Sequence, residues 1–161
     1  MPHTLRSATN EDRQAIENLV FGVLAEYGLS PDPSGTDADL ADIQTVYWQS
    51  GGSFDVLVDE AGQVVGSVGL CPVSNSTCEL RKMYLRLSTR GGGLGRRLLE
   101  HALAKAADLG FTRVVLETAT VLREAIDLYE KYGFRPFKPE HMAPRCDSAY
   151  FLDLPSRGIQ S

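Results

Sequence analysis

Four glycines fall within residues 91–95, between a strand-like run and an amphipathic helix, and this cluster constrains the fold more than any other feature. From Leu94 onwards apolar residues recur at every third or fourth position, which predicts a helix ending at Gly110. A helix start has backbone N–H groups without partners and the positive end of the helix dipole, and glycines let a phosphate approach that backbone. The cluster therefore indicates a phosphate site, unless the glycines only turn the chain and cap the helix.

Two common phosphate-binding motifs do not fit this cluster. No Gly-Lys-Ser/Thr sequence follows it, which argues against a Walker A loop. Arg96 and Leu98 stand where the third glycine of a G-x-G-x-x-G motif belongs. Both nucleotide-binding interpretations are therefore weak.

Periodicity along the rest of the chain predicts an α/β or α+β domain, with helices on the faces of a mixed sheet. Strands are expected at His3–Ala8, Phe54–Asp59, Gln63–Val73, Thr77–Arg86, Arg113–Thr118, Phe134–Lys138 and Ala149–Leu154. Further helices are expected from an Asn10 cap to Gly28, at Asp37–Gln49 and at Leu122–Tyr132.

The composition predicts one globular domain spanning residues 1–161. Of the 161 residues, 43% are hydrophobic and 23% are charged, so disordered and fibrous folds fit poorly. The three cysteines are odd in number and form no C-x-x-C pair, which favours a reducing compartment. The start of the chain is polar, and no window reaches the roughly 18 apolar residues of a membrane span, so a cytoplasmic location without a membrane partner is expected. The three histidines have no metal-ligand spacing, so no metal is expected.

Charge is divided unevenly along the chain. The net charge of −5 disfavours nucleic acid as a partner. Residues 14–80 hold ten acidic and no basic residues, whereas residues 81–161 hold 14 basic and nine acidic residues. The six basic residues between Arg81 and Arg97, with no acid among them, form a candidate anion site. Two solvated faces of opposite sign are the alternative interpretation.

A second motif follows the glycine cluster by about thirty residues: the run AIDLYEKYGF at residues 125–134. Together with Arg90-x-x-Gly93-x-Gly95, and with a strand between the two, it resembles the GNAT superfamily of acyl-CoA-dependent N-acetyltransferases. The likeness covers residues 79–137 in detail and the element order of nearly the whole chain. It implies a mostly antiparallel sheet of about six to seven strands flanked by four helices, with acetyl-CoA as the co-substrate.

The resemblance also implies where the coenzyme binds. Its pyrophosphate would lie on the backbone amides of residues 91–96, and its pantetheine arm in a cleft between the strands at residues 79–86 and 113–118. The expected coenzyme-binding residues are Met83, Tyr84, Leu85, Arg90, Gly91, Gly92, Gly93, Leu94, Gly95, Arg96, Leu122 and Tyr129. Many relatives carry an asparagine where this chain has Leu122, so the resemblance does not imply the polar contact to the coenzyme that this asparagine makes.

Three residues match the catalytic positions of the family. The N–H of Met83 would stabilise an oxyanion at the thioester carbonyl. Tyr129 matches the general acid that returns a proton to the departing thiolate, with a core tyrosine as the alternative. An amine with a pKa of about 10 must lose a proton before it attacks. Glu79 stands where some relatives carry the base for this step, although Glu117 or a water chain could serve instead.

The expected function is direct transfer of an acetyl group from acetyl-CoA to a primary amine of a small molecule, in a ternary complex. A route through a cysteine is disfavoured because no histidine lies close to one in sequence. A non-catalytic acyl-CoA-binding module and a transferase of longer acyl chains are the alternatives, and both monomer and homodimer are open. The resemblance implies that the two N-terminal helices and the loop between them shape the acceptor side. Four aspartates lie in that loop and the second expected helix, so a cationic amine is the expected acceptor: Asp32, Asp37, Asp39 and Asp42.

Overall fold

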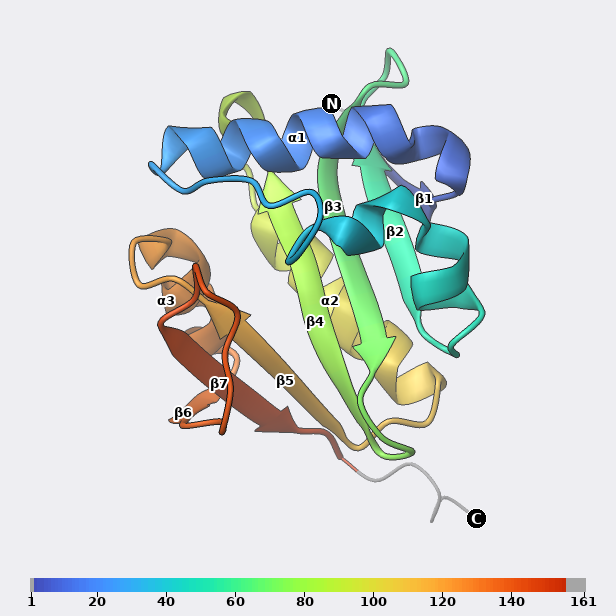
Figure 1. The fold of residues 1–161 in the computed structure, drawn as a ribbon. Coiled ribbons are helices and arrows are strands. Elements are labelled where there is room, and N and C mark those ends of the chain that lie inside the picture. The colour runs from blue at the N-terminus through green and yellow to red at the C-terminus, as the bar shows by residue number, and fades with distance from the viewer. Residues whose placement is uncertain (1, 156–161) are drawn as a thin grey trace.

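Seven strands form one sheet in the order β1-β2-β3-β4-β5-β7-β6, in a computed structural model that describes residues 2–155 (Figure 1). The strands are β1 (Thr4–Ser7), β2 (Ser53–Val58), β3 (Val64–Pro72), β4 (Thr77–Leu85), β5 (Arg113–Thr118), β6 (Arg135–Phe137) and β7 (Ser148–Asp153). The longer helices are α1 (Arg13–Glu26), α2 (Leu94–Asp108) and α3 (Arg123–Lys131). Short helical segments lie at Asn10–Asp12, Ala38–Ala41, Gln44–Trp48 and Leu87–Thr89. Residue 1 and residues 156–161 of the expected domain lie outside the described range.

The predicted fold class is confirmed. Each expected strand is present, with ends within a residue or two of their predicted positions. Neighbouring strands pair antiparallel except β4 and β5, which are parallel. Among the described helices, none combines the length and apolar character needed to cross a membrane.

The helix expected at Asp37–Gln49 is a wrong prediction, because the chain leaves the helical region at Asp42. Asp42 has φ −150° and ψ 72°, and it separates a 3₁₀ helix from a π-helical turn. Its carboxylate accepts hydrogen bonds from the Asn10 side chain at 3.1 Å and from the Thr45 amide at 3.2 Å. A side chain that binds nearby backbone in this way competes with a continuous helix.

Asn10 is also not the cap of the first helix. The Thr9 hydroxyl accepts a hydrogen bond from the Glu11 amide, and the Asp12 carboxylate accepts one from the Thr9 amide. These reciprocal bonds form a capping box one residue earlier than expected. The Asn10 side chain instead ties this turn to residues 42–44.

Each face of the sheet carries its own hydrophobic core. On one face, α1 and residues 38–48 bury Ile16, Val20, Tyr47 and Phe54. On the other face, α2 and α3 pack over β3, β4 and β5. Figure 1 shows α1 crossing in front of the strands and α2 running behind them.

The sheet opens between β4 and β5. Thr77, Cys78 and Glu79 pair with residues 113–115, and beyond Glu79 the two strands diverge (Figure 1). β5 pairs along its whole length with β7 on its other side. Within the described chain, the edge of β4 from Leu80 onwards therefore has no strand partner on the β5 side, and such an edge can pair with an extended ligand.

A β-bulge lies on β4 at the edge of this opening. The β3–β4 register shifts between the Ser67–Tyr84 and Gly69–Arg81 pairs, so Lys82 and Met83 fall outside the regular ladder. Lys82 has φ 55°, which residues other than glycine rarely adopt. The Ser67 hydroxyl donates a 2.6 Å hydrogen bond to the Lys82 carbonyl and holds this conformation. Strain of this kind clusters at functional sites, which makes the bulge a candidate site.

Candidate active site

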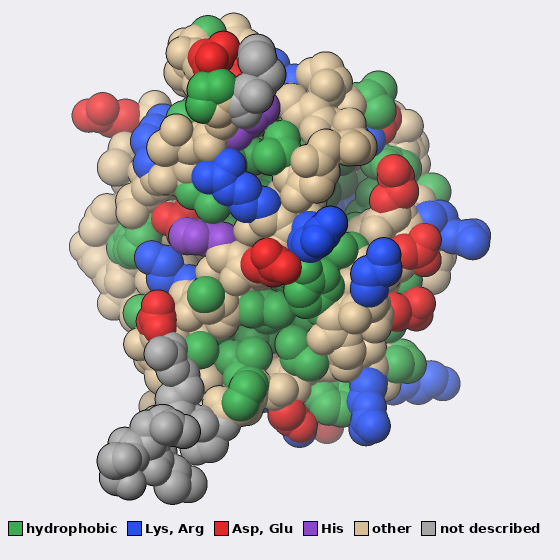
Figure 2. All heavy atoms as spheres, turned by 180° about the vertical axis from the view of Figure 1, so that it is seen from behind, with side chains coloured by type: hydrophobic (Ala, Val, Ile, Leu, Met, Phe, Trp, Pro, Cys, Tyr) green, Lys and Arg blue, Asp and Glu red, His purple; other side chains and the backbone are tan. Residues whose placement is uncertain are grey.

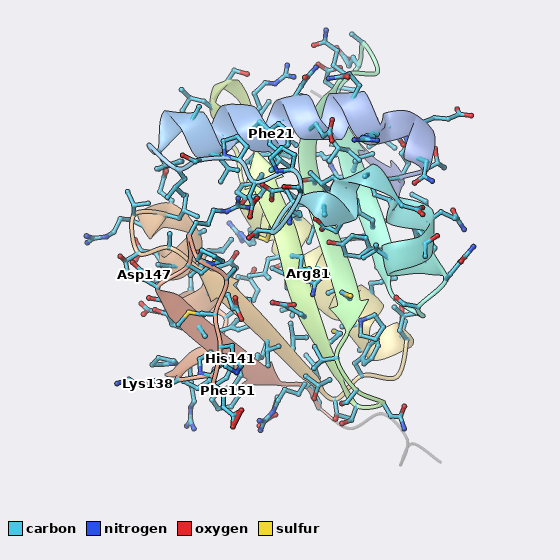
Figure 3. The ribbon with its side chains drawn as sticks, in the orientation of Figure 1. Phe21, Arg81, Lys138, His141, Asp147 and Phe151 are labelled. Carbon is cyan, nitrogen blue, oxygen red and sulfur yellow. The ribbon has the colours of Figure 1, made fainter. Side chains whose placement is uncertain are left out.

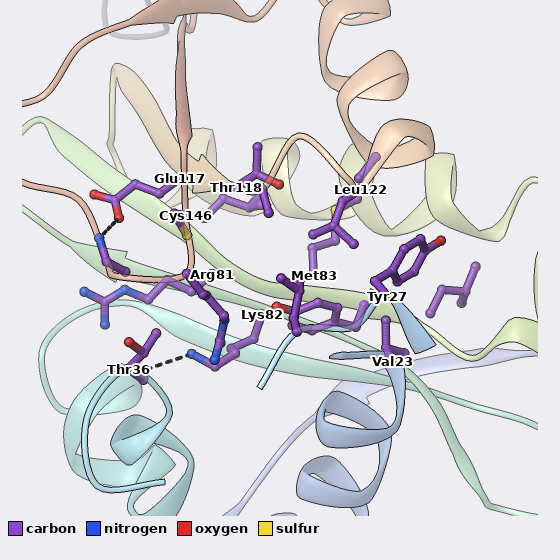
Figure 4. A pocket seen from close by; sticks show the side chains of 18 of the residues that line it. Val23, Tyr27, Thr36, Arg81, Lys82, Met83, Glu117, Thr118, Leu122 and Cys146 are labelled. Carbon is purple, nitrogen blue, oxygen red and sulfur yellow. Dashed lines mark hydrogen bonds between the residues drawn. The ribbon is translucent and has the colours of Figure 1, made fainter. Parts of the chain in front are cut away.

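A cavity of about 740 Å³ opens where β4 and β5 diverge (Figure 4). Residues 79–85 of β4 line it, together with the end of α1, residues 35–39, the end of β5, α3 and residues 143–146. Nine of the predicted site residues border this cavity: Glu79, Met83, Tyr84, Leu85, Arg90, Gly91, Gly95, Leu122 and Tyr129. Of the other four, Gly92 and Leu94 border a smaller hollow that shares Arg90 and Gly91 with the cavity, whereas Gly93 and Arg96 border neither.

The two ends of the cavity differ in chemistry. In Figure 4, Arg81, Glu117, Cys146 and Thr36 gather at one end, Leu122, Tyr27 and Val23 lie toward the other, and Met83 lies between them. Gly91 and Gly95 also border the cavity. We call the end at Arg81 and Glu117 the charged end, and the end at Leu122 and the glycine turn the glycine end.

The glycine turn, residues 91–96, presents open backbone. Gly91 and Gly93 have φ 89° and 82°, and a Cβ on Gly91, Gly92 or Gly93 would meet nothing within 4 Å. Within the described chain, the amides of residues 91–96 donate no backbone hydrogen bond, and the first such bond of α2 runs from the Arg97 amide to the Gly93 carbonyl at 3.1 Å. Amides in this state at a helix start can bind an anion.

Arg90 fastens the glycine turn to its surroundings. Its Nε and Nη2 donate hydrogen bonds to the Leu85 carbonyl at 2.9 and 2.7 Å. The guanidinium also forms an ion pair with Glu26 and lies 5.6 Å from the ring centroid of Tyr27. The Arg90 side chain thus ties the turn to the end of β4 and to α1.

The six basic residues between Arg81 and Arg97 do not form a single anion site, contrary to expectation. Arg81, Lys82 and Arg90 border the cavity, whereas Arg86 donates to the Val64 carbonyl and Arg97 to the His3 carbonyl. A strand and a helix point successive side chains in different directions, so closeness in sequence does not gather them. On the face seen in Figure 2, basic and acidic side chains are interspersed.

Tyr129 is buried on α3 and borders the cavity. Only 4% of the residue is exposed, and its ring packs against Phe134 with centroids 5.6 Å apart. Within the described chain the hydroxyl forms no hydrogen bond. Burial, reinforced by nearby Tyr84, raises the Tyr129 pKa well above 10, and burial raises the pKa of Tyr84 to about 12. Both phenols are therefore protonated at neutral pH.

Two carboxylates border the charged end. The Glu79 Oε1 lies 2.8 Å from Arg81 Nε, in a half-buried ion pair. Glu117, at the end of β5, accepts a 2.9 Å hydrogen bond from the Ala143 amide. The structure thus brings both candidate bases to the same cavity.

A buried ion network, which no sequence motif indicates, lies at the charged end. The Arg145 guanidinium donates to both oxygens of Asp37, at 2.8 and 2.5 Å. Lys82 Nζ lies 3.3 Å from Asp37 Oδ1 and 3.1 Å from Asp39 Oδ1, and Asp39 also accepts a hydrogen bond from Tyr47. The Lys82–Asp39 contact is an ion pair without the alignment of a hydrogen bond. The network joins residues 36–39, β4 and Arg145.

The four aspartates expected to attract an acceptor all have structural partners. Asp37 and Asp39 belong to the ion network. Asp32 accepts a hydrogen bond from the Thr36 amide at 2.9 Å, and Asp42 binds Asn10 and Thr45. At these positions the described structure presents no carboxylate without a partner to the cavity.

The three cysteines are neutral thiols at physiological pH. Burial raises the pKa of Cys146 to about 11 and that of Cys78 to about 12, and it also raises the pKa of Cys71. Because the thiolate is the nucleophilic form, this does not favour a covalent route through Cys146, which borders the cavity.

The chain is similar in sequence to known acetyltransferases. A sequence model of the acetyltransferase (GNAT) family matches residues 23–134. The uncharacterized N-acetyltransferase YjgM of Escherichia coli (strain K12) is 42% identical over 135 residues, which cover 81% of this chain and 80% of that protein.

Solved structures share the fold. An acetyltransferase of the GNAT family from Staphylococcus aureus Mu50 matches with a TM-score of 0.89 and 20% identity, covering 96% of this chain and 100% of that one. A phosphinothricin acetyltransferase from Sinorhizobium meliloti, solved in complex with AcCoA, matches with a TM-score of 0.75 and 20% identity, covering 100% and 93%. With the sequence match and the open sheet taken together, this chain belongs to the acetyltransferase (GNAT) family and is an acyltransferase enzyme.

Proposed function

We propose that this protein transfers the acetyl group of acetyl-CoA directly to the primary amine of a small molecule, within a ternary complex. The observation that carries this proposal is the divergence of β4 and β5 over a cavity with open backbone amides at one end and two carboxylates at the other. The Sinorhizobium meliloti neighbour, solved with AcCoA, supports acetyl-CoA as the donor.

The glycine end would hold the coenzyme chiefly through backbone. The amides of residues 91–96 would bind the pyrophosphate, and the free edge of β4 at Tyr84 and Leu85 would pair with the pantetheine arm. Leu122 would supply an apolar contact rather than a polar one. The Met83 N–H, next to the bulge, would stabilise an oxyanion, a device worth about 3 kcal/mol in other enzymes.

Tyr129 would act on the departing sulfur. Its raised pKa keeps the hydroxyl protonated at neutral pH, the state that a hydrogen-bond donor or general acid requires. Its pKa also lies above that of an ordinary thiol, so complete proton transfer to a thiolate is uphill. The phenol would therefore contribute most as a hydrogen-bond donor while the carbon–sulfur bond breaks.

Glu79 or Glu117 would remove a proton from the acceptor's ammonium group, directly or through water. Glu79 is held by Arg81 and Glu117 by the Ala143 amide, so both are oriented. Comparing Glu79→Gln with Glu117→Gln assigns the base: loss of the base lowers kcat/KM and flattens its rise with pH, whereas the other variant keeps the wild-type profile. Two unchanged profiles would assign the step to water alone.

A non-catalytic acyl-CoA-binding module is the alternative from another class. Such a module has no use for a buried phenol without a hydrogen-bond partner, and that observation favours the enzyme. A transferase of longer acyl chains differs from the proposal only in its donor.

A positively charged acceptor fits the acidic first half of the chain, although Glu79 and Glu117, rather than the four aspartates, would attract it.

The test is a turnover screen with acetyl-, propionyl- and longer-chain acyl-CoA against amino acids, polyamines, aminoglycosides and peptide N-termini. Release of coenzyme A together with an N-acetylated product supports the proposal. Tight acetyl-CoA binding without turnover of any amine would favour the binding module, and faster turnover of a longer donor would change the acyl group assigned.

A further inference from the structure

We propose that the acceptor carries a carboxylate beside its amine, as small amino acids do, and that Arg81 binds this carboxylate. This inference rests on the proposed acetyl transfer and names the substrate class of the same site. The observation behind it is the unequal pairing of the cations at the charged end of the cavity.

Two of the three cations at this end are already neutralised. Lys82 lies between Asp37 and Asp39, and Arg145 binds both oxygens of Asp37. The side chains of Lys82 and Asp37 are 6% and 0% exposed. Charges buried this deeply need their partners to remain in place, so these groups hold one another rather than a ligand.

Arg81 is paired only in part. Its Nε donates to Glu79 and its guanidinium also interacts with the Tyr47 hydroxyl, but among the described residues no carboxylate other than Glu79 pairs with it. The other titratable groups that act on Arg81 are Tyr47 and Cys71, and burial raises the pKa of both, so they are neutral. The Arg81 side chain is only 35% exposed.

A guanidinium in this state fits one kind of ligand group best. Its N–H donors form a planar fork that matches the two oxygens of a carboxylate. The terminal nitrogens have no carboxylate partner, and a charged acceptor gives the strongest hydrogen bonds to such donors. Figure 3 shows Arg81 in the middle of the front face of the sheet, and Figure 4 shows it at the same end of the cavity as Glu117.

The neighbouring carboxylates require that the ligand also carry a positive charge. No cation pairs with Glu117 among the described residues, and its Oε1 accepts only the Ala143 amide. A simple acid would meet both Glu79 and Glu117, and a simple amine would leave the terminal nitrogens of Arg81 without an anionic partner. A ligand with an ammonium group near Glu117 and a carboxylate on Arg81 gives each of these two side chains a partner of opposite charge.

The first test uses wild-type protein and matched acceptors: a panel of amino acids, their amides and their decarboxylated amines, each with acetyl-CoA. We expect kcat/KM for the preferred amino acid to exceed that for its amide about 10- to 100-fold, as for loss of a charge-assisted hydrogen bond. Equal or faster transfer to the amide or the amine would overturn the inference. Calorimetric binding of acetyl-CoA tests the proposed function separately, and binding without transfer to any carboxylate-bearing amine overturns only the present inference.

The second test asks whether Arg81 makes this distinction. We expect Arg81→Gln to reduce the acid-to-amide ratio of kcat/KM about 10-fold or more, and Arg81→Lys, which keeps the charge but not the fork, to have an intermediate effect. Arg113→Gln, at an exposed arginine paired with Asp153, is the matched control and keeps the ratio.

The acid-to-amide ratio of kcat/KM separates binding of the acceptor carboxylate by Arg81 from an indirect effect through Glu79, which Arg81 also contacts. If Arg81→Gln lowers transfer to acid and amide equally, Arg81 acts only through Glu79 and the inference is wrong. If Arg81→Gln does not fold, Arg81→Lys takes its place, and an acid-to-amide ratio unchanged from wild type in that variant overturns the role of Arg81.

Discussion

The glycine end and the charged end of the cavity are built by different means. At the glycine end, consecutive residues present backbone amides, and Gly91, Gly92 and Gly93 have no side chain to obstruct them. At the charged end, side chains from the loop after α1, from β4 and from the loop before β7 meet in one buried network. A backbone site depends on local conformation, whereas a side-chain network depends on segments distant in sequence keeping their places. Damage to the charged end should therefore affect the whole fold, and damage to the glycine end only the ligand.

The largest effect is expected from Asp37→Asn. Removing one charge from a buried ion network leaves its partners uncompensated, so the free energy of unfolding should fall by about 3–5 kcal/mol in urea denaturation at pH 7. Asp42→Asn, at an exposed residue where asparagine can keep the same hydrogen bonds, should cost less than about 1 kcal/mol. Equal losses in the two variants would remove the proposed role of the network.

The contribution of the same ion network to the stability of the wild-type protein should be measurable as a loss of stability at acidic pH. Burial opposes the ionisation of Asp37, but hydrogen bonds from Arg145 and the Asp32 amide outweigh it and lower the Asp37 pKa. The stabilisation is therefore complete above the ordinary aspartate pKa of about 3.9 and is lost as pH falls toward the folded value. We expect wild-type stability to fall more steeply than that of Asp37→Asn below about pH 4.

Tyr129→Phe should lower kcat about 10- to 1000-fold with little change in acetyl-CoA affinity, because it removes the proton donor and keeps the ring. Tyr132→Phe is the matched control, since its hydroxyl binds Glu100. The raised Tyr129 pKa also predicts no loss of kcat from ionisation of this phenol below pH 10. A Tyr129→Phe enzyme with wild-type turnover would leave Tyr129 as a core residue only.

The smallest effect is expected from Cys146→Ser. A thiol with a pKa of about 11 carries little thiolate at pH 7.5, so kcat should change less than about 2-fold. Mass spectrometry of the enzyme quenched during turnover provides the check. An acetyl group on Cys146 would contradict direct transfer.

The glycine end was predictable from sequence because its determinants are contiguous. Glycines before an amphipathic helix specify the turn by local conformation alone, and the strand–turn–helix was found where expected. Met83 and Tyr129 were predicted from the family motifs at residues 79–95 and 125–134 rather than from strand or helix period, because the bulge on β4 interrupts the regular alternation at Met83.

At the charged end, Glu79 and Glu117 were expected from the sequence, but the buried ion network could not be predicted. Arg145 and Asp37 are 108 residues apart, and the bulge that brings Lys82 beside Thr36 depends on the pairing of β3 with β4. A run of aspartates has the same pattern whether its members face solvent or are buried, so Asp37 and Asp39 resembled a free acidic surface. The interruption at Asp42 likewise depends on Asn10, a contact between distant segments.

The most direct test of the account is a calorimetric titration of acetyl-CoA into wild type, Gly93→Glu and Gly62→Glu. Gly93 and Gly62 share φ 82° and open surroundings, so the two substitutions carry the same backbone strain and the same added charge. Only Gly93 lies in the glycine turn. We predict that Gly93→Glu weakens acetyl-CoA binding by about 100-fold or more, equivalent to about 2.7 kcal/mol, while Gly62→Glu binds as wild type does. Wild-type affinity in Gly93→Glu would contradict the claim that this turn holds the coenzyme.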